Sequence, residues 1–205
     1  DRGGVVTRFT YDEAGQLVSI TYVSDTTDEG TVTYIYDDGG RRIKEIDPLG
    51  NVTTYTFDSA GRQLTKTDPL NRTTTYVYDE AGQLIASIDA NNHRIDHAYN
   101  SRGQLVLETY PDGSTVQYSY DGRGQRTNIT DQAGKITRNL YDDAGRLSMV
   151  VNPNNEATSY SYDENGNLLT ISDANGHQTS FAYDALNRQT RKTWPDNSYE
   201  EMRHD

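Results

Sequence analysis

A 21-residue period runs through almost the whole chain and constrains its fold more than any other feature. The period is carried by a Tyr-Asp pair or a close variant, with one first interval of 25 residues and intervals of 21 thereafter. A fixed period of this size indicates a repeat protein, in which each unit packs on its neighbours. The copies are Tyr11-Asp12, Tyr36-Asp37, Phe57-Asp58, Tyr78-Asp79, Tyr99-Asn100, Tyr120-Asp121, Tyr141-Asp142, Tyr162-Asp163, Tyr183-Asp184 and a degenerate His204-Asp205.

Each repeat holds two positions occupied only by Gly or Asn, the residues that tolerate a positive φ. The second position, fourteen residues after the Tyr, is filled by Gly or Asn from Gly50 to Asn197, and the five prolines stand two residues before it. Two obligate turns per repeat predict two strands per repeat. The first position, four residues after the Tyr, holds Gly15, Gly40, Gly61, Gly82, Gly103, Gly124, Gly145, Gly166 and finally Asn187.

The segments between the turns alternate with period two and are rich in Thr and Tyr, which is typical of strands. A second aromatic position, two residues before the Tyr-Asp pair, lies on the same face and creates an aromatic stripe that includes Tyr55, Tyr76, Tyr118 and Tyr160. The four extra residues near Ser24 to Gly30 predict a longer loop in the first repeat. We therefore expect an all-β chain of tandem antiparallel hairpins in one long sheet, which must curve or spiral because sheets beyond roughly ten strands do not stay flat.

Composition excludes several classes of function. Only 33% of the residues are hydrophobic and the mean hydropathy is -0.89, which is poor material for a conventional core. The net charge of -12 disfavours nucleic acid and membrane partners. The chain has no Cys and no apolar run long enough to insert into a membrane. We expect no cofactor and no metal.

The segment Tyr141-Asp142-Asp143-Ala144-Gly145-Arg146-Leu147 and its copies resemble the YD repeat of bacterial RHS proteins, of insecticidal toxin complex C subunits and of animal teneurins. The resemblance covers essentially residues 1–205, a single array of about nine to ten repeats. It implies a wall of a hollow β-shell that, in RHS toxins and toxin C subunits, encloses a toxic C-terminal domain in secreted or surface-delivered proteins.

The resemblance also sets the expected partners. The chain begins and ends within the pattern, so we expect it to be a fragment, with the rest of its parent chain and an enclosed toxin domain as partners. The family motif at which such cores release their cargo is incomplete here: Asp47-Pro48-Leu49-Gly50 resembles one part of it, but Arg42 and Asn51 depart from it. Free sheet edges also predict self-association.

Candidate catalytic and metal sites have plainer structural interpretations. An Asp after every Tyr is expected to bond its own turn, because a catalytic residue is needed only once. Asp163 to Asn167 and Asp173 to Gly176 resemble calcium loops but lack the closing Glu. His93 and His97 have metal-ligand spacing for a helix, but on a strand they are about 13 Å apart.

Two other functions and one other fold stay open. A binding module would recognise carbohydrate or a receptor through the aromatic face formed by Tyr55, Tyr76, Tyr118, Tyr160 and Trp194. An enzyme would need a constellation that is not repeated, and the irregular positions Ser24 to Gly30, His97, Asn139 and Trp194 are scattered. A β-propeller would use two repeats as one four-stranded blade.

Overall fold

The computed structural model describes residues 6–23 and 28–204, and in them it contains strands and turns but no helix. The expected all-β fold of antiparallel hairpins is therefore confirmed. The strands are β1 Val6–Tyr11, β2 Leu17–Val23, β3 Asp28–Tyr36, β4 Arg42–Ile46, β5 Val52–Phe57, β6 Gln63–Thr67, β7 Thr73–Tyr78, β8 Leu84–Ile88, β9 Arg94–Tyr99, β10 Leu105–Thr109, β11 Thr115–Tyr120, β12 Arg126–Thr130, β13 Ile136–Tyr141, β14 Leu147–Val151, β15 Ala157–Tyr162, β16 Leu168–Ser172, β17 Gln178–Tyr183, β18 Gln189–Thr193 and β19 Tyr199–Glu201.

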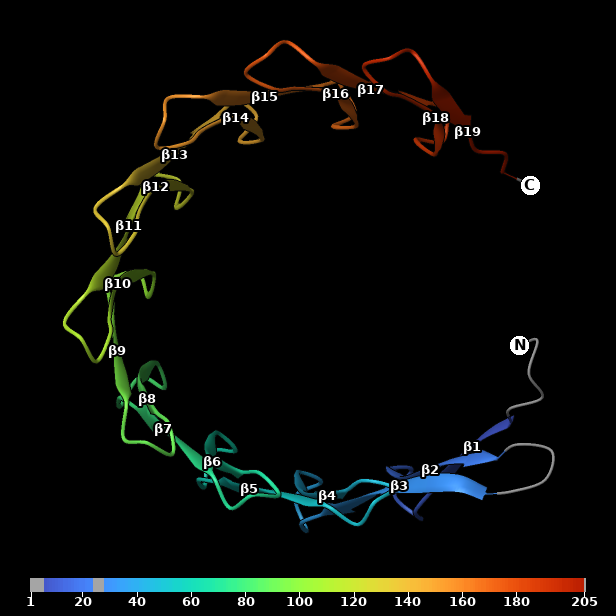
Figure 1. Ribbon diagram of the computed structural model, residues 1–205, viewed down its shortest axis with the longest axis vertical. Helices are drawn as coiled ribbons and strands as arrows, with labels where there is room; N and C mark the ends of the chain where they lie inside the picture. The colour runs from blue at the N-terminus through green and yellow to red at the C-terminus, as the bar shows by residue number, and fades with distance from the viewer. Residues whose placement is uncertain (1–5, 24–27, 205) are drawn as a thin grey trace. The chain divides into compact units, whose positions relative to one another are not determined.

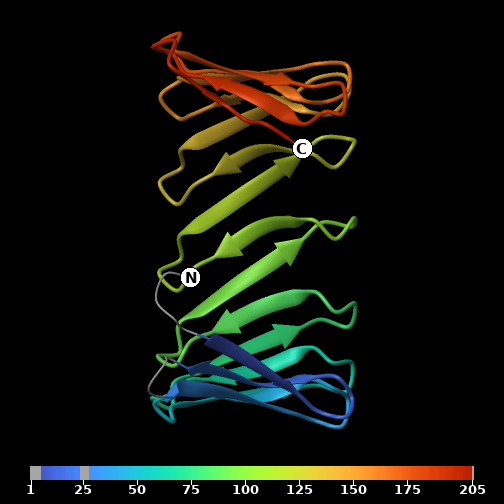
Figure 2. The ribbon, with the colours of Figure 1, turned by 90° about the vertical axis from the view of Figure 1, so that its right-hand side faces the viewer.

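The chain divides into two compact units. The first contains residues 1–97 and 110–113, and the second contains residues 98–109 and 114–205. Within each unit every strand pairs antiparallel with the strand that follows it in sequence, from β1 to β9 and from β10 to β19 (Figures 1 and 2). Ten successive paired strands in the second unit exclude separate four-stranded blades, so the propeller alternative is wrong.

The extra residues of the first interval lengthen strands. β2 has seven residues and β3 has nine, whereas β4 has five and β5 has six. Residues 28–30, which were expected in the longer loop, belong to β3, and the part of that expectation that falls on residues 24–27 lies outside the described residues. Longer strands gain ladder hydrogen bonds, which a longer loop would not.

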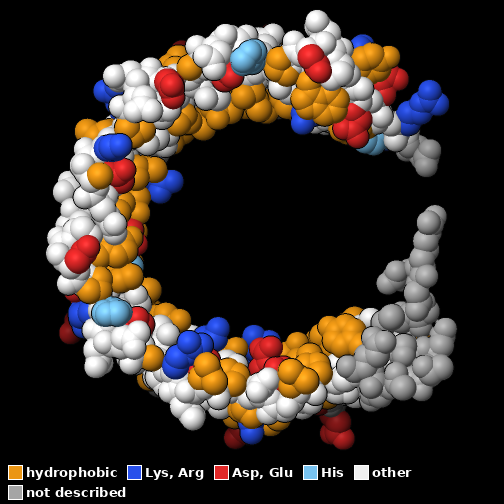
Figure 3. All heavy atoms as spheres, in the orientation of Figure 1, with side chains coloured by type: hydrophobic (Ala, Val, Ile, Leu, Met, Phe, Trp, Pro, Cys, Tyr) orange, Lys and Arg blue, Asp and Glu red, His pale blue; other side chains and the backbone are white. Residues whose placement is uncertain are grey.

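Neither unit has a conventional core, because each is a single layer of strands. Ala86 is the one hydrophobic residue that is fully buried among the described residues. Most strand side chains are instead half-buried against their cross-strand neighbours. Figure 3 shows hydrophobic side chains gathered along the concave side of each unit. Cross-strand pairs, rather than a packed interior, are therefore the source of side-chain stabilisation.

The two faces of the sheet differ in chemistry. Hydroxyl groups face each other across the strands on one of them, as in Thr56 with Thr65 at 2.7 Å and Thr67 with Thr73 at 2.8 Å. The stripe residues lie on the opposite face, because Tyr55 is one residue from Thr56 in the same strand. In the second unit Tyr118 pairs with Ile129, and Tyr160 pairs with Ile171.

Candidate functional site

The turn that follows each Tyr-Asp pair is closed by its own carboxylate. In the turn of Asp58, the Oδ1 atom accepts hydrogen bonds from the backbone N–H groups of Ala60 and Arg62, both at 2.9 Å. The backbone N–H of Gly61 donates to the carbonyl of Asp58 at 3.0 Å, and Gly61 has a φ of 82°. A turn of this kind, followed by one residue at positive φ, joins strands with the right-handed twist of the sheet. The carboxylates therefore act inside their turns.

The second turn of each repeat uses the same geometry, which the sequence reasoning missed. Asp47 accepts hydrogen bonds from the backbone N–H groups of Leu49 at 2.9 Å and Asn51 at 2.8 Å. The signal was available, because an Asp or Asn begins this turn in six of its eight copies: Asp47, Asp68, Asp89, Asp131, Asn152 and Asp173. The two exceptions begin with Tyr110 and Trp194.

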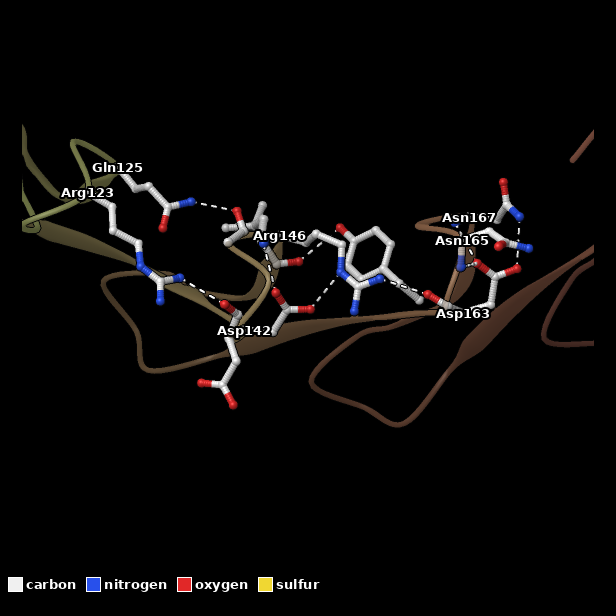
Figure 4. A network of polar contacts seen from close by, with 11 residues as sticks. Arg123, Gln125, Asp142, Arg146, Asp163, Asn165 and Asn167 are labelled. Atoms are coloured by element: carbon white, nitrogen blue, oxygen red, sulfur yellow. Dashed lines mark hydrogen bonds and ion pairs between the residues drawn. The ribbon is translucent and has the colours of Figure 1, made fainter.

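A long polar residue five positions after the Tyr links several turns to the next, and the sequence reasoning missed this too. Figure 4 shows Arg146 between two repeats. Its Nε donates to Asp142 Oδ2 at 2.7 Å, and its Nη1 donates to the carbonyl of Asp163 in the next repeat at 2.8 Å. Its guanidinium also lies 4.8 Å from the ring centroid of Tyr162, at a cation–π distance.

The same link recurs with other side chains. Gln125, which Figure 4 shows, reaches the carbonyl of Gly145 at 2.5 Å. In the first unit, Arg62 reaches the carbonyl of Asp79 at 3.2 Å. We call these contacts the inter-turn ladder. Because equivalent turns of successive hairpins are only about 10 Å apart, one side chain can span the gap.

The hydroxyl of the Tyr-Asp tyrosine ties its strand to the preceding hairpin. Tyr162 donates to the carbonyl of Leu147 at 2.9 Å, fifteen residues earlier, and Tyr78 donates in the same way to Gln63 at 2.9 Å. His204, which replaces the tyrosine in the last copy, keeps the contact, with Nε2 2.7 Å from the carbonyl of Gln189. A polar tip on an apolar ring thus satisfies a backbone acceptor at the end of a ladder.

The turn geometry lowers the pKa of many turn carboxylates, among them Asp58 and Asp163. The pKa of Asp58 is lowered first by the backbone N–H of Arg62 and then by its guanidinium. The pKa of Asp163 is lowered first by the side-chain amide of Asn167. Burial raises the pKa of Tyr162, and the Asp142 carboxylate adds to the effect. These shifts recur at turn after turn, which favours a structural origin over a catalytic one.

The residues of the expected ligand face, Tyr55, Tyr76, Tyr118, Tyr160 and Trp194, are half-buried. Tyr118 donates to Glu108 at 2.6 Å, and the Lys192 ammonium lies 5.0 Å from the Trp194 ring. Tyr55 and Tyr76 lie on the same face of the first unit, on β5 and β7, whereas Tyr118, Tyr160 and Trp194 belong to the second unit.

The candidate metal and catalytic residues also form hydrogen bonds within their own turns. Asp163 accepts hydrogen bonds at Oδ1 from the backbone N–H groups of Asn165 and Asn167, and at Oδ2 from the side-chain amide of Asn167. His93 lies in a turn, with its Nδ1 3.0 Å from Asp89 Oδ2. His93 thus precedes β9, whereas the sequence placed it on the strand. In the described part of the chain no group of three or more potential ligands could hold a metal ion, and no helix has the length and hydropathy to cross a membrane.

The repeat can be compared with known families once its turns, links and strands are defined. The sequence model of the RHS Repeat family matches residues 1–27, 36–70, 57–94, 99–136, 141–176 and 162–198. The chain belongs to the RHS repeat family. The expected relationship is therefore confirmed, and the Tyr-Asp turns described above are those of RHS repeats.

Solved structures of toxin complexes share the fold of this RHS repeat chain. The crystal structures of TcdB2-TccC3-Cdc42 and TcdB2-TccC3 match with TM-scores of 0.66 and 0.65 at 17% and 18% identity. The Tc holotoxin pore of Photorhabdus luminescens, with a mutated TccC3, matches with a TM-score of 0.64 at 18% identity. Each match covers 94% of this chain but only 12% of the other chain. No curated protein sequence matches the chain.

Proposed function

We propose that this chain is a wall segment of an RHS-type β-shell, part of a longer secreted protein that encloses a toxic C-terminal domain and helps to deliver it. One observation carries the proposal: in the described residues each unit is a single layer of strands, held together by contacts between neighbouring repeats and without a conventional core. Such a layer extends for as long as repeats are added, and it forms a barrier without performing chemistry. The likeness to Tc toxin structures supports the same function.

Protease protection in the longest natural protein that contains this segment tests the proposal. We expect its C-terminal domain to resist digestion when the wall is intact. A variant with Asp142→Ala, Arg146→Ala and Tyr162→Ala removes one complete set of inter-turn contacts and should make that domain sensitive. Ser59→Ala, in an exposed turn, is the matched control and should leave the domain resistant. Rapid digestion of the C-terminal domain in the unaltered protein would refute enclosure.

A further inference from the structure

Two second turns of the array are nearly identical in sequence. Residues 89–93 read Asp-Ala-Asn-Asn-His and residues 173–177 read Asp-Ala-Asn-Gly-His, so the two turns differ only in their fourth residue. That residue is Asn92 in the turn that joins β8 to β9, and it is Gly176 in the turn that joins β16 to β17. The chain therefore contains two versions of one turn, one with a side chain at this position and one without.

The two turns also share their geometry. The N–H of Gly176 donates to the carbonyl of Asp173 at 3.1 Å, and Gly176 has a φ of 81°. The N–H of Asn92 donates to the carbonyl of Asp89 at 3.0 Å, and Asn92 has a φ of 63°. In each turn the closing His lies with its Nδ1 2.9 or 3.0 Å from the first Asp, and all five residues are exposed. Any difference in their chemistry therefore comes from the fourth residue.

Asn175-Gly176 is one of two Asn-Gly pairs in the chain, and Asn is a thermolabile residue. The backbone nitrogen of the residue after an Asn can bond to the Asn Cγ and give up its proton, while the Cγ–Nδ2 bond breaks and ammonia leaves. Water then opens the resulting cyclic imide at either of its carbonyl groups, which yields aspartate or isoaspartate. The residue loses ammonia and gains water, so no oxidant or cofactor is needed. Gly as the second residue favours the attack, because it has no Cβ and adopts the widest range of backbone conformations.

The turn of Asn175 can open without disturbing its neighbours. Every hydrogen bond that residues 173–176 make in the described part of the chain stays within residues 173–177. A Cβ added at Gly176 would meet no atom within 4 Å. Opening releases the Gly176 nitrogen from the Asp173 carbonyl, and exposed segments with few contacts open most readily. The attacking nitrogen is thus accessible in the folded protein.

The other Asn-Gly pair, Asn165-Gly166, lies in a turn of the inter-turn ladder (Figure 4). Arg146 of the preceding repeat donates to the carbonyl of Asp163 at 2.8 Å, and the same carbonyl accepts the N–H of Gly166. The side-chain amide of Asn167 donates to an Asn side chain of the following repeat at 2.8 Å. Opening this turn disturbs contacts on both sides, so its Asn-Gly pair is protected by comparison.

We propose that Asn175 is the principal site of spontaneous deamidation in this chain, and that its modification loosens the β16–β17 hairpin. Isoaspartate places one more methylene in the backbone of the turn, and the length of a turn fixes the register of its hairpin. Either product also adds a carboxylate close to Asp173, and like charges repel. The hairpin therefore changes in charge and in flexibility as the protein ages.

Incubation of the folded 205-residue chain at neutral and mildly alkaline pH, followed by peptide mass spectrometry, tests the proposal. The exchange of ammonia for water should appear first at Asn175, more slowly at Asn165, and last at Asn91. Gly176→Asn, which copies the β8–β9 turn, should slow the reaction at Asn175 at least about tenfold, because a side chain then hinders the attacking nitrogen. Asn92→Gly is the reciprocal variant and should make Asn91 reactive.

Two further measurements separate the effect of the fold from that of the sequence. In urea, where both turns are unfolded, Asn165 and Asn175 should react at nearly equal rates. Hydrogen exchange in β16 and β17 should be faster in the aged chain, and it should be unchanged in Gly176→Asn aged for the same time, with circular dichroism verifying that each variant is folded. Earlier reaction at Asn165 in the folded chain, equal rates at Asn175 and Asn91, the same preference for Asn175 in urea, or unchanged exchange after deamidation would each overturn the proposal. The wall function does not depend on these results, because this turn makes no contact of the inter-turn ladder.

Discussion

The hydroxyl group of each Tyr-Asp tyrosine does more than place a polar tip in water. It reaches back to the first residue of the preceding strand, where the backbone ladder has ended and a carbonyl would otherwise face solvent. Phe57 shows that the ring alone is tolerated at this position, with Arg41 stacked 5.4 Å from its centroid. The ring and the hydroxyl therefore contribute separately.

Replacing Tyr162 by Phe should lower the free energy of unfolding by about 1 kcal/mol, since it deletes one hydrogen bond to a backbone carbonyl and keeps the ring. Tyr160→Phe is the matched control: it removes a hydroxyl from the same strand, but that hydroxyl has no hydrogen bond within the described part of the chain. Urea unfolding of the two variants measures the difference. Equal effects would mean that the contact with Leu147 adds nothing.

Gly30 is a glycine whose replacement should be unusually costly. Its φ of 123° disfavours any other residue, and a Cβ there would lie 2.4 Å from the Cβ of Pro48 in a neighbouring turn. Gly30→Ala should therefore destabilise the first unit by at least about 2 kcal/mol. Gly50→Ala, also at positive φ but with open space around its Cβ, should cost less. Thermal unfolding of both variants separates the two effects: Gly50→Ala carries only backbone strain, whereas Gly30→Ala carries backbone strain and a steric clash with Pro48.

At the scale of the turn and the hairpin, the sequence predicts where the turns lie better than it predicts which side chains contact each other. Period and turn residues are enough to place both turns of the repeats from Tyr36 onward, because Gly or Asn is required where φ is positive. They do not show that Asp47 and Asp58 close their turns in the same way, or that Arg146 bridges two repeats. Those contacts depend on which side chains the sheet twist brings together, and a single repeat does not contain that information.

The turns also predict an acid limit to stability. The pKa values of ten turn carboxylates are lowered in the folded chain: Asp37, Asp47, Asp58, Asp68, Asp89, Asp142, Asp163, Asp173, Asp184 and Asp196. Their contribution to the free energy of unfolding is therefore present above the unfolded pKa, near 3.8. It is lost as the pH falls through the lower pKa values of the folded chain. The unfolding temperature should stay level from pH 7 to about 5 and fall below about pH 4.

The control for this prediction uses amides that are already present. Asn100 and Asn152 fill the same turn position and accept the same backbone hydrogen bonds. A variant with Asp58, Asp142 and Asp184 changed to Asn should retain the turns and lose part of the acid sensitivity. If the dependence of the unfolding temperature on pH is unchanged in this variant, groups outside the turns cause the loss of stability in acid.

At the scale of the whole molecule, we expect the free energy of unfolding to be a sum of contributions from the repeats and from the interfaces between neighbouring repeats. Within each unit, contacts between elements join only strands that are consecutive in sequence. Proteins built in this way behave as one-dimensional arrays, with a term for each repeat and a term for each interface. Loss of one internal repeat should therefore lower stability without abolishing the fold.

Deletion of residues 142–162 tests this, because it removes 21 residues and joins Tyr141 to Asp163. The shortened chain should remain folded, with an unchanged β-sheet circular dichroism signal per residue. Deletion of 20 residues, 143–162, leaves one extra residue in the joined turn and should disrupt it, since a one-residue slip moves every following side chain to the opposite face. Failure of both deletions to fold would show that the array depends on contacts beyond neighbours.

The inter-turn ladder also bears on how such a chain can evolve. Every contact type closes within one repeat and the next, so unequal recombination between the coding copies can add or remove whole units while each junction remains complete. Length then changes in steps of 21 residues, and no compensating substitution is needed elsewhere. The same locality allows a single unit to acquire a new surface chemistry while its neighbours continue to hold the sheet.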